Sequence, residues 1–127
     1  MTTTIAARMT TKQIANRLKL LCSKGKFEQA QRELFADDAV SIEQEASPMF
    51  DKETHGLEAI VEKGHKFDDM VEKMHSNDVS DPLIAGNSIA MASTMDVTMK
   101  GRPRETMSEL CVYKVKDGKV ISEEFFM

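Results

Sequence analysis

Residues 88–127, SIAMASTMDVTMKGRPRETMSELCVYKVKDGKVISEEFFM, decide the fold because apolar and polar side chains alternate along three stretches of them. The stretches cover 88–99, 104–116 and 120–126. An alternation with a period of two is typical of strands that pack one face against a core. Asp117-Gly118 separates the last two stretches and favours a two-residue hairpin turn, in which both central residues adopt positive φ. The sequence therefore predicts three consecutive antiparallel strands.

Helical patterns fill most of the sequence before these strands. Thr10 and Gln13 form a capping box at the start of the first helix, and Gly25 is a natural stop signal after it. Gly64 interrupts the apolar stripe of the longest helix, and we expect it to allow another element to approach closely. The predicted elements are helices over 10–23, 27–35 and 56–74, a strand over 39–45 and a weaker strand within 75–84. Helices gathered on one face of an antiparallel sheet make an α+β fold.

The composition is that of an ordinary globular domain. The chain has 127 residues, of which 41% are hydrophobic and 30% are charged, and its formal net charge is -4. We expect a disordered tail over 1–9 and a single domain over 10–127. No basic field is present to hold a phosphate backbone, and no apolar run is long enough to span a bilayer, so neither nucleic acid nor a membrane is an expected partner. Two isolated cysteines, Cys22 and Cys111, favour a cytoplasmic location.

The hairpin turn also predicts which side chains of the last two strands share a face. Counting outward from the turn pairs Tyr113 with Ser122. Side chains alternate between the two faces along each strand. We therefore expect Glu109, Tyr113 and Glu124 to lie on one side of the sheet.

The pairing of the first two strands depends on the longer turn at 100–103. If Met99 lies opposite Arg104, Asp96 joins the face of Glu109, and the methionine and isoleucine side chains lie on the opposite face. A shift of one residue in this pairing would invert the assignment.

The face that carries Glu109 and Tyr113 has two interpretations. It is either a solvated or dimer-packing side of the sheet, or the wall of a cavity in which small residues leave room and a few polar groups fix a ligand. A carboxylate buried in such a cavity would have a raised pKa. It could then remove a proton next to a carbonyl group, while Tyr113 stabilised the enolate.

Three motifs, in this order along the chain, resemble the SnoaL-like branch of the nuclear transport factor 2-like superfamily. They are Phe35-Ala36-Asp37-Asp38-Ala39, Gly56-Leu57-Glu58-Ala59-Ile60 and Asp117-Gly118-Lys119-Val120. The resemblance implies a cone-shaped α+β barrel, in which a bent antiparallel sheet wraps around the long helix and an N-terminal helical hairpin precedes it. It also implies a pocket at the wide end and a homodimer formed through the sheet. Members include polyketide cyclases, ketosteroid isomerase and binding proteins without a known reaction, so the fold alone does not assign a function.

The resemblance transfers few site residues. In ketosteroid isomerase a carboxylate base follows the Asp-Asp-Ala motif, and Glu43 stands at that position here, with Glu45 next on the same side of the strand. The isomerase also uses a tyrosine from its first helix, where this chain has Leu18 or a neighbour, which argues against steroid isomerisation. Polyketide cyclases of the family use an acidic residue in the cavity, for which Asp96, Glu109 and Glu124 are the candidates.

These observations define two candidate functions. The first is binding of a small apolar organic molecule with acid/base chemistry of the cyclase or isomerase type, and the second is a non-catalytic ligand-binding or dimeric interaction domain. The candidate catalytic residues are Glu43, Asp96, Glu109 and Glu124, and the candidate ligand-binding residues are Leu18, Glu45, His75 and Tyr113. The three histidines lie ten residues apart, which is not a ligand spacing, so we expect no metal site, and nothing in the sequence calls for a cofactor.

Overall fold

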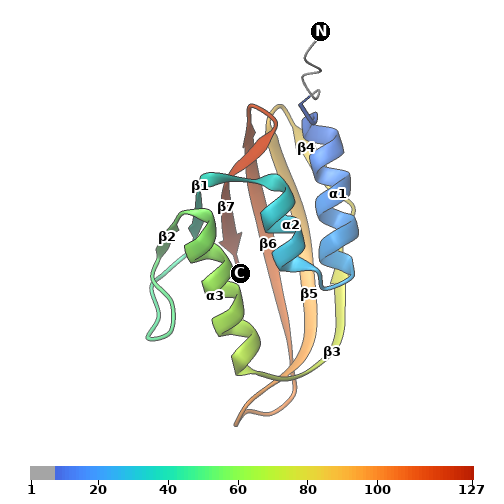
Figure 1. Cartoon of the computed structure of the whole chain (residues 1–127). Coiled ribbons are helices and arrows are strands. Elements are labelled where there is room, and N and C mark those ends of the chain that lie inside the picture. Colours follow the sequence, from blue (N-terminus) through green and yellow to red (C-terminus); the bar gives the residue numbers. More distant parts are fainter. Residues whose placement is uncertain (1–7) are drawn as a thin grey trace, which may run out of the picture.

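A computed structural model describes residues 8–127, and the predicted tail therefore falls largely on residues outside this range. Over the described residues the chain forms three helices and seven strands (Figure 1). The helices are α1 (Thr11–Ser23), α2 (Phe27–Leu34) and α3 (Leu57–Met70). The strands are β1 (Phe35–Ile42), β2 (Glu53–His55), β3 (Val71–Val79), β4 (Leu83–Ala85), β5 (Ser88–Met99), β6 (Glu105–Lys116) and β7 (Lys119–Phe126). The predicted α+β class is confirmed.

The strands form one curved sheet in the order β2-β1-β7-β6-β5-β3, and β4 pairs with the other end of β5. Every pair is antiparallel except β1 and β7, which run parallel. The sheet is therefore mixed, whereas the sequence predicted a purely antiparallel one. The parallel pair arises because β7 inserts between β1 and β6, and so joins an early segment of the chain to the C-terminal hairpin.

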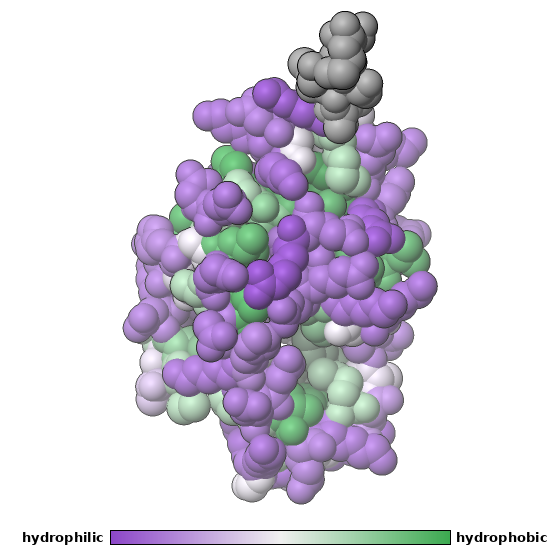
Figure 2. Space-filling model, in the orientation of Figure 1, coloured by the Kyte–Doolittle hydropathy of each residue, from purple (hydrophilic) through white to green (hydrophobic). Residues whose placement is uncertain are grey.

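The three helices cover one face of the sheet (Figure 1). The capping box predicted at Thr10 is present, and α1 buries Ile14, Leu18 and Leu21, each at most 3% exposed, against the sheet. The outer side of the helices is largely hydrophilic, and apolar residues show there only in small separate patches (Figure 2). The core thus lies between the helices and the concave side of the sheet.

Two boundaries between helix and strand differ from the predictions. The long helix ends at Met70 rather than near 74, because Val71 and Met74 already pair with β5. The strand predicted from 39 instead begins at Phe35, directly after α2. In both places pairing with a neighbouring strand outweighs the weak local preference for helix.

The turn between β6 and β7 is confirmed, since Asp117 and Gly118 have φ of 52° and 75° and Lys116 lies opposite Lys119. A β-bulge follows one residue later and shifts the register between the two strands. Tyr113 consequently lies opposite Glu123 and not Ser122. The predicted shared face of Tyr113 and Glu124 is therefore wrong, because the extra residue in β7 brings Glu123 to that face instead.

The register between β5 and β6 follows the inverted alternative. Ser93 lies opposite Glu109 and Met91 opposite Cys111, so the apolar stripe of β5 shares the inner face with Glu109. Asp96 consequently points to the outer face, where its carboxylate accepts two hydrogen bonds from Arg104 at 2.8 and 2.6 Å. The expectation that Asp96 shares a face with Glu109 is wrong, because the chain pairs with one residue of shift at the turn.

Candidate functional site

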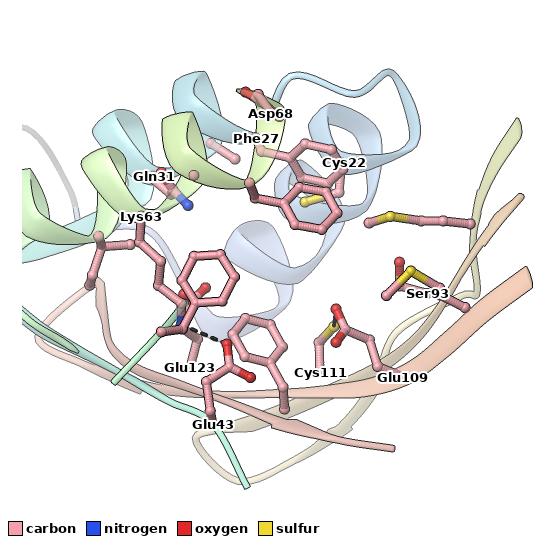
Figure 3. Close-up of a pocket in the computed structure, with 18 of the residues that line it drawn as sticks. Cys22, Phe27, Gln31, Glu43, Lys63, Asp68, Ser93, Glu109, Cys111 and Glu123 are labelled. Carbon is pink, nitrogen blue, oxygen red and sulfur yellow. Dashed lines mark hydrogen bonds and ion pairs between the residues drawn. The ribbon is translucent and has the colours of Figure 1, made fainter. Parts of the chain in front are cut away.

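A cavity of about 720 Å³ lies between the helices and the inner face of the sheet. Its lining is mostly apolar, with phenylalanines from α2, α3 and β7 and six of the ten methionines of the chain. Polar side chains gather on the sheet side of this space, where Figure 3 shows Glu43, Glu109 and Glu123. A pocket of this size with an apolar lining and a few convergent polar groups suits a small organic ligand.

A chain of polar contacts crosses one wall of the cavity. The buried Ser41 hydroxyl of β1 donates a hydrogen bond of 2.6 Å to Oε2 of Glu123, which is 6% exposed. Nζ of Lys63, from α3, donates to Oγ of Ser41 at 3.0 Å and forms an ion pair of 2.7 Å with Glu43. Lys63 also lies over the ring of Phe125, 5.4 Å from its centre. Three elements that are distant in sequence therefore position the Glu123 carboxyl group.

The pKa of the Glu123 carboxyl group lies near neutral pH. Burial raises its pKa from 4.5 to about 7, while the hydrogen bond from Ser41 and the charge of Lys63 act in the opposite direction. The nearby carboxylates of Glu43 and Glu109 raise the pKa further. At neutral pH both forms of Glu123 are therefore populated.

Glu109 is the second carboxyl group of the cavity wall with an altered ionisation. Burial raises its pKa, and the charge of Glu43 adds to that effect. The thiol of Cys111 donates to its Oε1 across 3.8 Å, which is a weak contact. Glu109 thus lies in surroundings that favour its protonated, hydrogen-bond-donating form more than water does.

Two thiols and a phenol also line the cavity. Burial raises the pKa of Cys22 to about 12 and raises the pKa values of Cys111 and Tyr113 above their usual ranges. All three groups therefore keep their protons at physiological pH, which argues against a thiolate nucleophile. The ring of Tyr113 packs edge-on against Phe35, with 6.4 Å between centres.

The structure brings five of the eight candidate residues together on the cavity wall: Leu18, Glu43, Glu45, Glu109 and Tyr113. The other three lie elsewhere. Asp96 is paired with Arg104 on the outer face, Glu124 lies opposite Val112 on that same face, and His75 bonds to the Thr98 hydroxyl at 2.8 Å. They do not belong to the lining of the cavity.

Ser41, Lys63 and Glu123 were missed by reasoning from the sequence. A lysine in a helix is usually solvated, but Lys63 follows the buried Ile60 by three positions and so shares its helix face. Glu123 was missed because of the bulge in β7, for which the sequence gives no glycine signal. The spacing from Ile60 was therefore a usable signal for Lys63, and none existed for the bulge.

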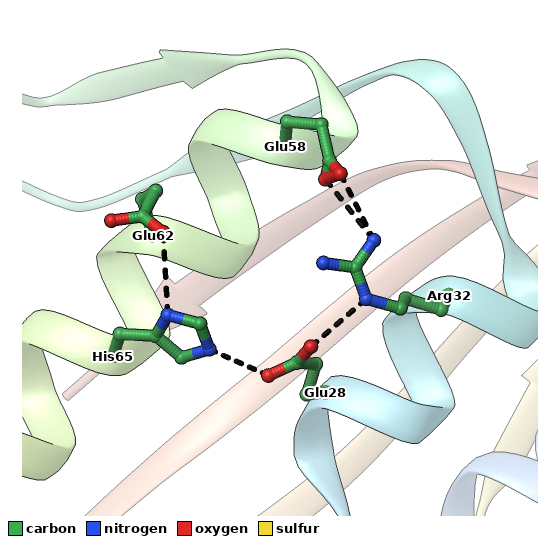
Figure 4. A network of polar contacts seen from close by, with 5 residues as sticks. All are labelled: Glu28, Arg32, Glu58, Glu62 and His65. Atoms are coloured by element: carbon green, nitrogen blue, oxygen red, sulfur yellow. Dashed lines mark hydrogen bonds and ion pairs between the residues drawn. The ribbon is translucent and has the colours of Figure 1, made fainter.

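A second group of charged residues joins α2 to α3 at the surface (Figure 4). Glu28 contacts His65 at 2.6 Å and Arg32 at 2.9 Å, and Arg32 reaches Glu58 at 3.0 Å. The hydrogen bond that His65 donates to the Glu28 carboxylate raises the pKa of His65. Each of these side chains is 45% exposed or more, so this network is solvated although Glu28 and His65 also border the cavity.

Over residues 8–127, no three His, Cys, Asp or Glu side chains lie close enough together to hold a metal ion. None of the helices described there combines the length and apolar character needed to cross a membrane.

Comparisons with known proteins agree on the family and the fold. The SnoaL-like domain model matches residues 9–127. A solved structure from Mesorhizobium loti, named as a candidate SnoaL-like polyketide cyclase, is 32% identical with a TM-score of 0.86, covering 94% of this chain and 100% of that one. Among curated proteins, no sequence matches this chain.

Two more distant structures share the fold. An NTF2-like protein of unknown function from Burkholderia pseudomallei is 15% identical, with a TM-score of 0.78 over 94% of this chain and 92% of that one. TerC, co-crystallised with polyporic acid, is 13% identical, with a TM-score of 0.75 over 92% of this chain and 90% of that one. The predicted resemblance and the NTF2-like fold are confirmed.

Proposed function

This chain belongs to the SnoaL-like domain family, and from that premise we propose that its cavity binds a small, largely apolar carbonyl compound and catalyses proton transfer next to the carbonyl group. The reaction is of the cyclase or isomerase type. Glu123 acts as the base and Glu109 as the acid. The family supplies the class of reaction, and the residues of this chain support the roles.

The observation that carries this proposal is the pair of carboxyl groups with raised pKa values on one apolar wall. A base works best when its pKa lies near the operating pH, and the pKa of Glu123 is about 7. Ser41 donates a hydrogen bond to Oε2 of Glu123. No described residue forms a hydrogen bond with Oε1, so this oxygen is available to a ligand. Among residues 8–127, the hydrogen-bond partner of Glu109 is the weak thiol donor of Cys111, so Glu109 is available to donate a proton when protonated.

The chemistry follows from these two states. Ionised Glu123 removes a proton from the carbon next to the carbonyl group, and the electron pair of that C–H bond moves to the carbonyl oxygen. Protonated Glu109 and the Tyr113 hydroxyl stabilise the developing enolate by hydrogen bonding. The enolate then either takes the proton back from Glu123 at another carbon, which isomerises the substrate, or attacks a second carbonyl carbon of the same molecule, which closes a ring. In the second case the π electrons of that carbonyl group move to its oxygen, which takes the proton of Glu109, and Glu109 regains a proton from solvent.

The cavity supports a ligand of this class by size and by lining. Its volume of about 720 Å³ falls within the range of pockets for small organic molecules. TerC, which shares the fold, was co-crystallised with the organic compound polyporic acid. Flexible methionine side chains can adapt to a ring system without a change in the sheet.

Hydrogen–deuterium exchange tests this proposal directly. Cyclic ketones that carry hydrogen on the carbon next to the carbonyl group are first screened for binding, and the compounds that bind are incubated in D₂O with the protein. We expect the wild-type protein to accelerate exchange at the carbon next to the carbonyl group, and Glu123→Gln and Glu109→Gln to lose about 100-fold of that rate. Glu124→Gln, one residue away on the outer face, is the matched control and should keep it.

The same experiment tests the alternative function. Binding without any acceleration of exchange would overturn the enzymatic proposal and leave a non-catalytic ligand-binding domain. The cavity supports that second candidate as well, because its apolar lining does not depend on the carboxyl groups.

We also propose that two copies associate through the outer face of the sheet. This outer apolar patch consists of Leu83, Ala90, Ala92, Leu110, Val112 and Phe126, which neighbour one another on β4 to β7, and Leu83 is 75% exposed. Sedimentation velocity should show a dimer that Leu110→Glu converts to a monomer. Leu20→Glu on α1, where the leucine is similarly exposed, is the control. A wild-type monomer at all concentrations would contradict the proposal.

A cytoplasmic location is proposed from the chemistry of the two cysteines. Cys22 and Cys111 are both free and buried, and a reducing compartment keeps thiols in that state. Fractionation of cells that express the chain with a small epitope tag would test the location, and recovery from an extracellular fraction would contradict it.

A further inference from the structure

Lys63 is unusual in placing its ammonium group inside the site. Its side chain is only 14% exposed, and it reaches from α3 to the end of β1. The group contacts the Glu43 carboxylate, the Ser41 hydroxyl and the face of the Phe125 ring. A buried lysine that contacts two different strands is held in one position, unlike a lysine on a solvated helix face.

The ammonium group decides how Ser41 uses its single hydrogen. An ammonium group can only donate hydrogen bonds, so the Ser41 oxygen must act as the acceptor for Lys63. The Ser41 hydrogen is then directed along the contact of 2.6 Å to Oε2 of Glu123. Both oxygens of an ionised carboxylate can accept the hydrogen bond from Ser41. In a protonated carboxyl group one of the two oxygens carries a hydrogen, and if that oxygen faced Ser41, two donors would meet. The relay from Lys63 through Ser41 therefore suits ionised Glu123.

Glu43 acts against this relay. Its carboxylate neutralises part of the charge of Lys63 at 2.7 Å, and it adds a negative charge near both Glu109 and Glu123. Because like charges disfavour ionisation of a neighbouring carboxyl group, Glu43 favours the protonated forms of both. The two members of one ion pair thus have opposite effects on the base.

We propose that Lys63 and Glu43 are opposed positioning residues: Lys63, acting through Ser41, orients Glu123 and favours its ionised form, and Glu43 limits that effect. The inference deepens the proposed function and rests on it for its biological meaning. It assigns Glu43 a role other than that of the base. It also explains why a lysine occupies the inner face of α3.

The other groups that face Glu123 do not change this conclusion. They are Glu109, Cys111 and Tyr113 from β6 and Cys22 from α1. The two thiols and the phenol stay neutral at physiological pH, since burial raises their pKa values. Glu109 is the remaining group that ionises there, and all the variants below retain it.

The test is a titration of the protein without ligand. Carboxyl carbon resonances of glutamate residues are followed by NMR against pH, and the Glu123 resonance is assigned with Glu123→Gln. We expect Lys63→Met and Ser41→Ala to raise the titration midpoint of Glu123, Lys63→Met by about one pH unit or more, and Glu43→Gln to lower it. Lys66→Met is the matched control, because Lys66 is also on α3 and lies 5.4 Å from the Phe50 ring, but does not border the cavity.

The direction in which each variant moves the Glu123 midpoint decides whether the proposal holds. A Glu123 midpoint that is unchanged in both Lys63→Met and Glu43→Gln, or that moves in the same direction in both, would overturn the proposal. If Lys63→Met does not fold, Glu43→Gln alone remains decisive, because Glu43 is 26% exposed and its isosteric amide keeps the packing.

This titration is independent of the proposed reaction. Midpoints that move in opposite directions in a protein without exchange activity would uphold the positioning roles and refute only the enzymatic function. If exchange is catalysed, the acid limb of its pH–rate profile should move upward in Lys63→Met and downward in Glu43→Gln. A lysine that only supported the fold would change the rate without moving that limb.

Discussion

Helix α3 carries two ionic networks that begin two residues apart. Lys63 leads inward to Glu43, Ser41 and Glu123, and His65 leads outward to Glu28 (Figures 3 and 4). The contact distances are similar, at 2.7 Å for Lys63–Glu43 and 2.6 Å for His65–Glu28. The exposure differs: 14% and 26% for the inner pair, against 47% and 45% for the outer pair.

This difference in burial decides what each network can do. Solvent and salt screen an exposed ion pair, so its effect on stability and on neighbouring groups is small. In the inner network, low polarity strengthens each electrostatic effect and brings the pKa of Glu123 to about 7. The same helix thus contributes one residue to a solvated surface network and another to the surroundings of a buried carboxyl group.

The largest expected effect is the loss of pH-dependent stability in Glu123→Gln. Because the folded protein holds the Glu123 proton up to about pH 7 and the unfolded chain releases it near 4.5, the free energy of unfolding falls as the pH rises between these values and is level above them. The shift corresponds to on the order of 3 kcal/mol. Urea unfolding from about pH 5 to about pH 8 should show that Glu123→Gln removes this slope, which the control Glu124→Gln should retain. A variant with the wild-type slope would show that another group is responsible.

Breaking the inner ion pair should have the next largest effect. Lys63→Met leaves the Glu43 carboxylate without its partner and Ser41 without its donor, and we expect a destabilisation of about 2 kcal/mol that added salt does not remove. The double variant Lys63→Met with Glu43→Gln should recover part of the loss. Denaturant unfolding at low and high salt measures both effects, and a purely additive double variant would argue against a coupled pair.

Gly64 lies between Lys63 and His65. Replacing it should change the free energy of unfolding by a smaller amount and stabilise the protein rather than destabilise it. A methyl group on Gly64 would meet no atom within 4 Å, since the residue borders the cavity, so the predicted close approach of another element is wrong. Gly64→Ala should therefore stabilise the protein by about 1 kcal/mol through helix propensity. Gly64→Leu should fill cavity space and weaken ligand binding while the protein stays folded. Thermal unfolding and calorimetric binding distinguish these effects, and a strongly destabilised Gly64→Ala would contradict the open space.

The smallest effect is expected in the outer network. Glu28→Gln removes the partner that raises the pKa of His65, so that pKa should fall toward its ordinary value, as NMR of the ring protons would show. The stabilisation by this pair is present below the ordinary pKa of histidine and is lost as the pH rises through the raised value. At physiological salt we expect little change in the unfolding midpoint. A loss as large as that of Lys63→Met would abolish the distinction between the two networks.

The sequence predicted the class of fold, the helical hairpin and the β6–β7 turn because each has a local cause. The alternation over 88–127, the capping box at Thr10 and the pair Asp117-Gly118 act within a few residues of themselves. The C-terminal end of α3 and the start of β1 are set by pairing with distant strands, so local patterns placed them about four residues away.

Which side chains line the cavity depends on the register at two places, where a shift of one residue exchanges the two faces of a strand. In β7, the run Ser122-Glu123-Glu124-Phe125 has one glutamate on each face, so the pattern cannot tell which carboxyl group is inside. For β5 a physical signal existed: the stripe containing Ile89 and Met91 belongs on the same buried face as Cys111 and Tyr113. Requiring the two apolar stripes to share one core would have selected the observed register and excluded Asp96.

The parallel pairing of β1 with β7 has a consequence for the order in which the protein is made. Ser41 and Glu123, which bond directly across this pair, are separated by 82 residues of chain. At typical rates of translation this separation is on the order of ten seconds, during which one edge of β1 has no partner strand. Nascent chains of this protein therefore expose an open strand edge until the strand that carries Glu123 emerges from the ribosome, and the cavity wall and its buried carboxyl group are completed in the same step.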